Sequence, residues 1–454
     1  MKKSASDPIG WLKKKIESGE IDTVAVAFPD VLGRLMGKRA TGHYFLEHIL
    51  DGGTHGCNYL LVVNMEMDPV DGFKLANWDK GFGDFSMVPD PASARPLPWQ
   101  TGTALVLCDL YHHDGKLVEE APRSVLRRQI ERLASHSLSC KAASELEFFL
   151  FNQTYQSAKA GGYAALAPSS EYRIDYHILQ PGRDEEIFRE MRLMLESAGI
   201  AVETTKGEWG CGQHELNILY DDPLPMADKH IILKLCVKEI AARHGKCVTF
   251  MPKYNSKEAG SSCHIHISIW KDGKNLFWDS KRNEGSKFFR QFLGGLLKYT
   301  PELSYFMAPT VNAYKRYQPM SWAPTKMVWA MDNRTAGFRV VGHGSSYRIE
   351  NRMPGADANP YLAFAAMIIA GMAGVEEDLD CGEVYQGNAY TDKNLKALPK
   401  TLREAADLLD KSRLARSVLG DAVVDFYVHT AHSEMDAYES AVTDWERARY
   451  FEQI

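Results

Sequence analysis

The stretch SELEFFLF, residues 144–151, places Glu145 and Glu147 inside an otherwise apolar run. Successive side chains of a β-strand point to opposite faces, so a strand here would set both glutamates and Phe149 on one face. Leu146 and every second residue after it would form an apolar opposite face. Two carboxylates on one face repel each other and are costly to bury unless positive charge compensates them. The stretch therefore predicts a core strand with one charged face, the alternative being that the pair simply faces solvent.

The composition is that of a large globular protein. The chain has 454 residues, 45% apolar and 25% charged, enough for a large core and roughly two to four domains. Its 53 basic and 59 acidic residues give a net charge of −6, which offers no support for nucleic-acid binding. No apolar run is long enough to predict a membrane helix, and residues 361–375 are expected to form a buried helix. Eight cysteines without a CxxC pair, and a basic start without an apolar segment, predict a cytoplasmic location.

Apolar patterning divides the chain into a small α/β part, about residues 1–105, and a larger α+β part, residues 106–454. In the first part we expect a helix over 7–20, paired strands over 21–30 and 33–40, a helix over 43–53, a strand over 58–65 and an ordered loop over 68–99. Further along we expect strands over 103–111, 141–151, 172–179, 214–220, 247–253 and 261–270, and helices over 121–136, 184–199, 226–245 and most of 401–454.

Three further segments carry charged or imidazole side chains where a core strand would be apolar. They are EWGCGQHE with Glu208 and Glu215, SSCHIHIS with His264 and His266 on one face, and YRIENR with Glu350. Carboxylates with one imidazole suit Mg²⁺ or Mn²⁺ better than Zn²⁺. Each segment alone has a plainer interpretation, such as a surface histidine pair or a glycine loop. Their co-occurrence favours a site for divalent ions, which would also attract nucleotide phosphates.

Arginines form a second cluster, among aromatic residues, glycines and asparagines: Arg316, Arg334, Arg339, Arg348 and Arg352. Such surroundings suit oxyanion or carboxylate binding, although closely spaced arginines are often only solvated charge. Metal-binding glutamates that face arginines are typical of phosphoryl transfer, because both stabilise the transferred negative charge. No Walker A motif occurs, and no GxGxxG loop joins a strand to a helix, so a nucleotide would bind outside those two schemes.

Seven ordered motifs resemble the glutamine synthetase family: GFGDFSMVPDP (81–91), PRSVLRR (122–128), FMPK (250–253), GSSCHIHIS (260–268), APTVNAYKR (308–316), DNRT (332–335) and RIENRMPGADANPYL (348–362). The resemblance spans nearly the whole chain. It implies a β-grasp domain over residues 1–105 and a catalytic domain over 106–454, with a curved antiparallel sheet flanked by helices. It also implies a homo-oligomer of two stacked rings whose subunits share sites. The implied chemistry is ATP-dependent formation of γ-glutamyl phosphate, followed by attack of an amine.

The resemblance assigns roles to the residues that match the family's motifs. The ion near glutamate would be held by Glu147, Glu208 and Glu215, and the ion near the ATP phosphates by Glu145, His264 and Glu350. The phosphoryl group would be contacted by His266, Arg334 and Arg339, and the glutamate carboxylate by Arg316 and Arg352, with Gly260 leaving room for its backbone. The nucleotide side would involve Ser268 and Arg348.

The chain departs from ammonia-using members of the family at two positions. GTHGCNYLL (53–61) carries Cys57 and Asn58 where those enzymes have an acid, and Trp322 occupies the place of a flap glutamate. Replacing a carboxylate with an indole removes charge and adds apolar surface, which can stack on an alkyl or aryl group or attract a cationic amine. We therefore expect a γ-glutamyl-amine ligase that turns over free ammonium poorly.

The identity of the amine stays open: methylamine, ethanolamine, isopropylamine, aniline and polyamines are all compatible. The competing interpretations are glutamine synthesis with a rearranged ammonium site, ligation of another carboxylate, and a non-catalytic descendant of the fold. Intact ligands and arginines argue against the last. Lys396 in NLKALP (394–399) stands where adenylylated members have a tyrosine, so we expect that control to be absent.

Overall fold

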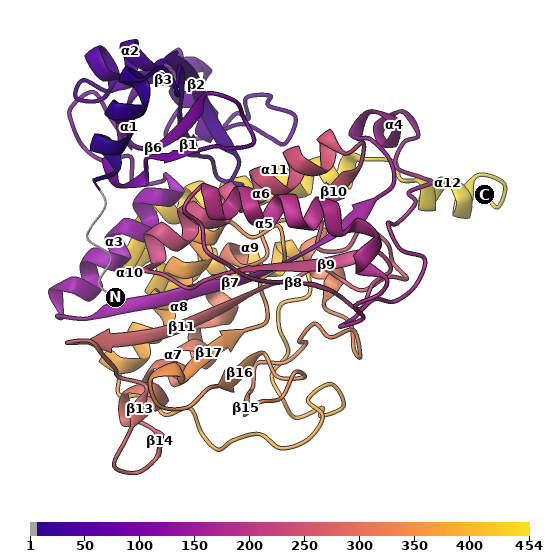
Figure 1. Cartoon of the computed structure of the whole chain (residues 1–454). Helices are drawn as coiled ribbons and strands as arrows, with labels where there is room; N and C mark the ends of the chain where they lie inside the picture. Colours follow the sequence, from indigo (N-terminus) through magenta and orange to yellow (C-terminus); the bar gives the residue numbers. More distant parts are fainter. Residues whose placement is uncertain (1–6) are drawn as a thin grey trace.

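The computed structural model describes residues 7–454, which form two main sheets, the larger one covered by helices (Figure 1). Residues 1–6, part of the basic start considered above, lie outside the described residues. Within residues 7–454, no helix combines the length and the apolar character needed to cross a membrane.

The N-terminal part is a mixed sheet with a short helix beside it. Its elements are α1 (Pro8–Glu17), β1 (Thr23–Pro29), β2 (Leu35–Thr41), α2 (Gly42–Tyr44), β3 (Thr54–Cys57), β4 (Asp84–Pro89), β5 (Arg95–Pro96) and β6 (Thr103–Tyr111). The strand order is β2-β1-β6-β4-β3, and β5 pairs with β6. β1 and β2 form the expected antiparallel pair, whereas β1 runs parallel to β6.

Two expectations for this part are wrong. Residues 58–65 do not form a strand, because the chain turns in a 3-10 helix over Asn58–Leu61. Inside the expected loop, β4 pairs with both β3 and β6, so distant partners supply the hydrogen bonds that the local pattern does not predict. A division of the chain at residue 105 would cut β6, and we propose to place it after Tyr111.

The larger part is built on a nine-stranded sheet of order β15-β16-β17-β11-β7-β9-β8, with β10 beside β7 and β12 beside β11. Its strands are β7 (Ser139–Phe151), β8 (Val202–Gly207), β9 (Gln213–Ile218), β10 (Cys247–Thr249), β11 (Cys263–Lys271), β12 (Lys274–Asn275), β15 (Trp329–Met331), β16 (Phe338–Val341) and β17 (Arg348–Asn351); β13 (Trp278–Asp279) and β14 (Glu284–Gly285) form a separate pair. Neighbouring strands run antiparallel except β15 and β16.

The helices of this part are α3 (Pro122–Ser135), α4 (Tyr155–Ala160), α5 (Glu185–Ser197), α6 (Pro223–Arg243), α7 (Lys287–Leu303), α8 (Pro360–Glu376), α9 (Leu402–Asp410), α10 (Arg413–Leu419), α11 (Asp421–Ser440) and α12 (Asp444–Tyr450). The strand expected over residues 172–179 is absent. That segment has turns and one isolated bridge from Arg173 to Cys211, and although Ile174 is buried, Ile178 is 88% exposed, so the apolar alternation does not face a sheet along its length.

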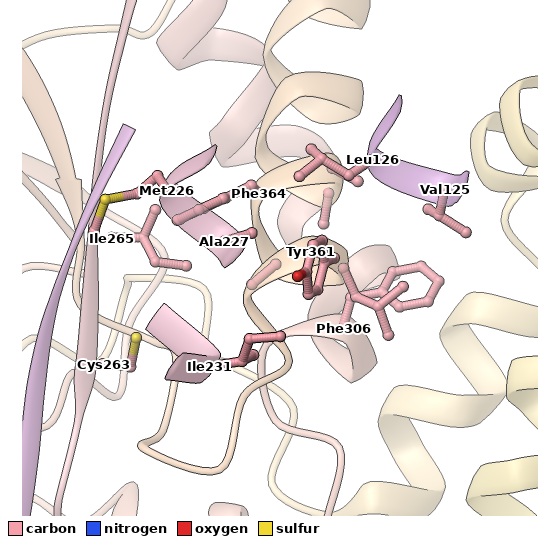
Figure 2. Packing of buried hydrophobic residues seen from close by; sticks show 14 of the residues in the cluster. Val125, Leu126, Met226, Ala227, Ile231, Cys263, Ile265, Phe306, Tyr361 and Phe364 are labelled. Carbon is pink, nitrogen blue, oxygen red and sulfur yellow. The ribbon is translucent and has the colours of Figure 1, made fainter. Parts of the chain in front are cut away.

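The main core lies between one face of the large sheet and α3, α6 and α8. Leu146 and Phe148 of β7 and Ile265 of β11 are fully buried in it. Figure 2 shows Ile265 in the same cluster as Ile231 of α6 and Phe364 of α8. α8 is buried along nearly its whole length, which confirms the buried helix expected from its sequence. The opposite face of β7 and β11 is thereby left for polar side chains.

A buried arginine joins the two parts of the chain. Arg123 of α3 binds Asp109 (Nη1 to Oδ1, 2.6 Å) and Asp90 (Nη2 to Oδ2, 2.7 Å) from the N-terminal part. It also makes a two-pronged contact with Asp228 of α6, at 3.1 and 3.0 Å. Breaking such a buried pair would leave uncompensated charge inside the protein, so this contact holds the N-terminal sheet against the helices.

Candidate active site

Strand register brings the predicted acids and histidines together on one face of the large sheet. Glu145 of β7 lies opposite His264 of β11, and Glu147 lies opposite Glu215 of β9. His266 lies opposite Glu350 of β17. Residues paired across neighbouring strands point to the same face, so side chains from four segments far apart in the sequence converge.

One trio consists of Glu145, His264 and Glu350. His264 Nδ1 lies 3.2 Å from Glu145 Oε2 and 3.7 Å from Glu350 Oε1. Side chains of the chain itself contact these carboxylates: His266 Nε2 is 2.7 Å from Glu145 Oε1, and the Arg339 guanidinium donates from Nη1 to Glu350 Oε2 at 2.7 Å. Arg352 pairs with Glu350 on its other oxygen.

These neighbours control the protonation of the first trio. Burial acts to raise the pKa of Glu350, but Arg352 and the two histidines outweigh it and lower that pKa to about 2. Hydrogen bonds from both histidines likewise hold the pKa of Glu145 well below its ordinary value, against the effect of burial. Burial and the nearby Arg352 lower the pKa of His264 to about 4, so its imidazole is neutral at pH 7 and available as a ligand.

The second trio consists of Glu147, Glu208 and Glu215. The Ser262 backbone N–H donates to Glu147 Oε2 at 2.8 Å, and Asn217 Nδ2 donates to Glu215 Oε1 at 2.9 Å. Burial and the charge of Glu208 raise the pKa of Glu147 to about 7, and burial and the neighbouring glutamates raise the pKa of Glu215 to about 9. This trio lacks the arginines that compensate the first one.

Both trios fit divalent cations. Within each, one ligand atom from every member lies within 4.8 Å of the others. Five carboxylates and one neutral imidazole, without a thiolate, form a hard donor set of the kind that Mg²⁺ and Mn²⁺ prefer. Burial and, after it, repulsion from neighbouring glutamates raise the pKa values of Glu147 and Glu215, and a divalent ion would oppose both effects.

The trios open into a cavity of about 870 Å³. Its wall includes Glu145, Glu147, Glu208, Glu215, His264, Gly260, Arg316, Arg334, Arg339, Arg352 and Trp322. Four other predicted site residues do not line it: His266, Ser268, Arg348 and Glu350. Glu350 is fully buried behind the wall, where it contacts Arg339 and Arg352, and His266 contacts Glu145. Arg348 lies one residue further from the cavity, where its Nε donates to His266 Nδ1 at 3.0 Å.

Gly260 and Arg316 form one close-packed corner of the cavity. Arg316 is buried and donates from Nη1 to the Met353 carbonyl (2.8 Å) and from Nη2 to the Arg352 carbonyl (2.7 Å). A Cβ added at Gly260 would lie 2.4 Å from Arg316 Cγ and 2.8 Å from the Pro252 carbonyl. Only glycine fits here without displacing the arginine.

Trp322 meets a second indole that sequence reasoning did not single out. The rings of Trp322 and Trp209 pack edge to face with centroids 5.6 Å apart, and both line the cavity while 48% and 37% exposed. Arg352 Nη2 donates to the Trp322 carbonyl at 3.3 Å, and Arg173 lies over the Trp209 ring. The sequence could have indicated this residue, because Trp209 directly follows the predicted metal ligand Glu208. Cys57 and Asn58 do not line this cavity in the described chain.

Comparison with known proteins agrees with this arrangement. Residues 119–450 match the glutamine synthetase catalytic domain family. The chain is 48% identical to gamma-glutamylethanolamide synthetase GlnA4 of Streptomyces coelicolor over 97% of its length and 94% of the relative's. It is 36% identical to a glutamate–isopropylamine ligase of a Pseudomonas species, with 97% of each chain covered.

A solved structure of GmaS in complex with ADP superimposes with a TM-score of 0.84 at 27% identity, covering 97% of this chain and 99% of that one. Such family members use ATP and divalent metals, and their catalytic fold mixes helices with a curved, nearly barrel-shaped sheet. The sheet, the two trios and the sequence matches lead to the same conclusion: this chain belongs to the glutamine synthetase family.

Proposed function

We propose that this protein is an ATP-dependent ligase that joins the γ-carboxylate of glutamate to a small organic amine. The observation that carries the proposal is the pair of indoles, Trp209 and Trp322, on the wall of the cavity that five of the six trio residues line. An apolar wall gains free energy from an alkyl substituent, about 0.8 kcal/mol for each buried CH₂ group. Free ammonium has no such group. Similarity to the ethanolamide synthetase and the isopropylamine ligase supports the same substrate class.

The reaction proceeds in two steps. A γ-carboxylate oxygen of glutamate attacks the terminal phosphorus of ATP, giving γ-glutamyl phosphate and ADP. The amine nitrogen then attacks the carbonyl carbon of the γ-glutamyl phosphate (Cδ of glutamate), a proton leaves that nitrogen, and phosphate departs from the same carbon, giving the γ-glutamyl amide. Arg334 and Arg339 stabilise the phosphoryl oxygens, with His266 beside them. Arg316 and Arg352 hold the glutamate carboxylate, and Gly260 leaves space for its backbone.

The two trios would bind Mg²⁺ or Mn²⁺. Glu147, Glu208 and Glu215 hold the ion near glutamate, and Glu145, His264 and Glu350 hold the ion near the nucleotide. When bound, these ions neutralise negative charge on phosphate and carboxylate oxygens. Ser268 and Arg348 belong to the nucleotide-binding part of the site. Trp270 orients Ser268 by donating to its Oγ at 2.8 Å, and Arg348 contacts His266.

The finer architecture follows the same family resemblance. The N-terminal sheet is a β-grasp domain, and the enzyme is a cytoplasmic homo-oligomer of two stacked rings. In the ring, Cys57 and Asn58 of one subunit reach the cavity of its neighbour, which accounts for their distance from the cavity of their own chain.

The proposal is tested by phosphate release from ATP with Mg²⁺ and glutamate, one amine at a time, with product mass confirming each amide. We expect turnover of ethanolamine and isopropylamine and little of ammonium. In Trp322→Ala, the KM for isopropylamine should rise about tenfold, the equivalent of about 1.4 kcal/mol. Trp445→Ala is the matched control, because that indole is 62% exposed on α12 and does not line the cavity. A wild-type preference for ammonium would overturn the proposal.

A further inference from the structure

A lysine of the chain itself fills a cation-binding corner of the cavity. Lys206, the penultimate residue of β8, places its Nζ 3.3 Å from Asp175 Oδ1 and 3.3 Å from the Gly207 carbonyl, and it also pairs with Glu208. The same Nζ lies over the Tyr176 ring, 4.3 Å from its centroid. Two carboxylates, a carbonyl and an aromatic face are the groups that bind an ammonium ion.

This corner is part of the cavity wall. Asp175, Tyr176, Lys206 and Glu208 all line the cavity, and Glu208 also belongs to the second acidic trio. Lys206 lies opposite Glu215 in the strand register, so its side chain starts on the acidic face of the sheet. The ammonium group of Lys206 is therefore held beside the carboxylates that a small cationic substrate would have to approach.

The segment that completes the corner is held in an uncommon conformation. Tyr176 has a φ of +54°, in the left-handed region that non-glycine residues seldom adopt. Its backbone N–H donates to the Gly207 carbonyl at 3.3 Å, next to Lys206, and Arg173 bridges to Cys211 across the same gap. These contacts fix the ring under the lysine although residues 172–179 do not form a strand.

We propose that Lys206 determines acceptor specificity by occupying the cation position in which free ammonium would bind. A tethered ammonium group has an effective concentration in the millimolar range or above, and it competes with the free ion for the same carboxylates and ring. Ammonium can bind only through its charge and its N–H groups, so it has no apolar contact to replace the occupied cation position. An alkylamine also contacts Trp209 and Trp322, so its binding does not depend on the occupied corner. This inference rests on the proposed function and names the feature that excludes ammonium.

The test uses the full-length enzyme and two substitutions of one residue. Lys206→Met keeps the aliphatic stem and removes the charge, and we expect the KM for ammonium to fall about tenfold or more while the KM for isopropylamine changes less than about threefold. Lys206→Arg should retain the wild-type ratio of the two KM values. Lys229→Met is the matched control, because Lys229 pairs with Asp221 and does not line the cavity. Both substrates use the same metal sites, so any change in metal affinity affects both reactions and cancels in the ratio.

A binding measurement supplies a second readout that does not depend on turnover. Titration calorimetry with ammonium chloride should detect binding to Lys206→Met and not to the wild type. If Lys206→Met does not fold, Lys206→Gln takes its place. An unchanged KM ratio together with no new ammonium binding would overturn the inference. The proposed function is judged separately on the wild type, since it fails if isopropylamine and ethanolamine yield no amide, whatever Lys206 does.

Discussion

The two acidic trios share one face of one sheet but have opposite electrostatic surroundings. Glu350 in the first trio is fully buried between Arg339 and Arg352, and its pKa falls to about 2. Glu215 in the second trio is buried among other glutamates, and its pKa rises to about 9. The arginines of the protein itself compensate the first trio, whereas, within residues 7–454, only Glu208 of the second trio has a cationic partner, Lys206, and the repulsion among its glutamates is left for an added cation to relieve. Similar donor atoms can therefore be a stabilising element in one place and a latent repulsion in another.

The largest effect is expected from breaking the compensated trio. Glu350→Ala would leave the buried Arg352 without its carboxylate partner and Arg339 with only the exposed Asp332, which should lower the free energy of unfolding by about 3–5 kcal/mol. Chemical denaturation of the metal-free protein measures this. Glu208→Ala is the matched control and should cost less than about 1 kcal/mol, because Lys206 keeps Asp175 as a partner. Equal losses in the two variants would contradict the comparison.

A smaller effect is expected from supplying the missing cation. Adding Mg²⁺ or Mn²⁺ to chelator-treated protein should stabilise it by about 2–3 kcal/mol at one hundred times the dissociation constant, since the ions bind only the folded chain. Thermal unfolding with increasing metal concentration measures the shift. In Glu215→Gln the shift should shrink, because one ligand of the second trio loses its charge. A full shift in that variant would show that the stabilising ions bind elsewhere.

The smallest effect is a pH dependence that has opposite signs in the two trios. Because the folded-state pKa of Glu215 is raised to about 9, stability falls as pH rises from its ordinary value, near 4.3, toward 9. Glu215→Gln should therefore stabilise the metal-free protein at pH 8 by about 1 kcal/mol and have little effect at pH 4. The lowered pKa of Glu350 contributes stability that is present above its ordinary pKa and is lost as pH falls toward 2.

Denaturation at several pH values in the presence of a chelator measures both slopes. The wild type and Glu215→Gln should differ most at alkaline pH. If Glu215→Gln destabilises the metal-free protein at pH 8, the carboxylate is already compensated in the folded chain and the contrast between the trios is wrong.

Much of the candidate site could be predicted because its signal is local. Acids at alternate positions of SELEFFLF, and histidines at alternate positions of SSCHIHIS, stand out because the strands around them are apolar. The structure places these residues on one face of the sheet. The helix over residues 360–376 was also predictable, because an uninterrupted apolar run of that length must be buried on all sides.

The features that the sequence did not reveal depend on distant partners. Residues 172–179 have the apolar alternation of a strand, yet within the described chain they make only an isolated bridge to Cys211 and one backbone hydrogen bond to Gly207, and they form the turn that carries Asp175 and Tyr176. β4 was hidden in a segment rich in proline and glycine because its hydrogen bonds come from β3 and β6. Trp209 and Lys206 carry no motif of their own.

The sequence by itself determined which residues could bind metal and phosphate, because a charged side chain in an apolar strand needs compensation wherever the chain folds. It also determined the presence of the indole at position 322. Only the tertiary structure decided how those charges are compensated, since strand register places Arg339 against Glu350, and places Glu147 and Lys206 on the two sides of Glu215. Electrostatic interactions depend on separations of a few ångströms between residues far apart in the chain, and sequence spacing does not specify those separations.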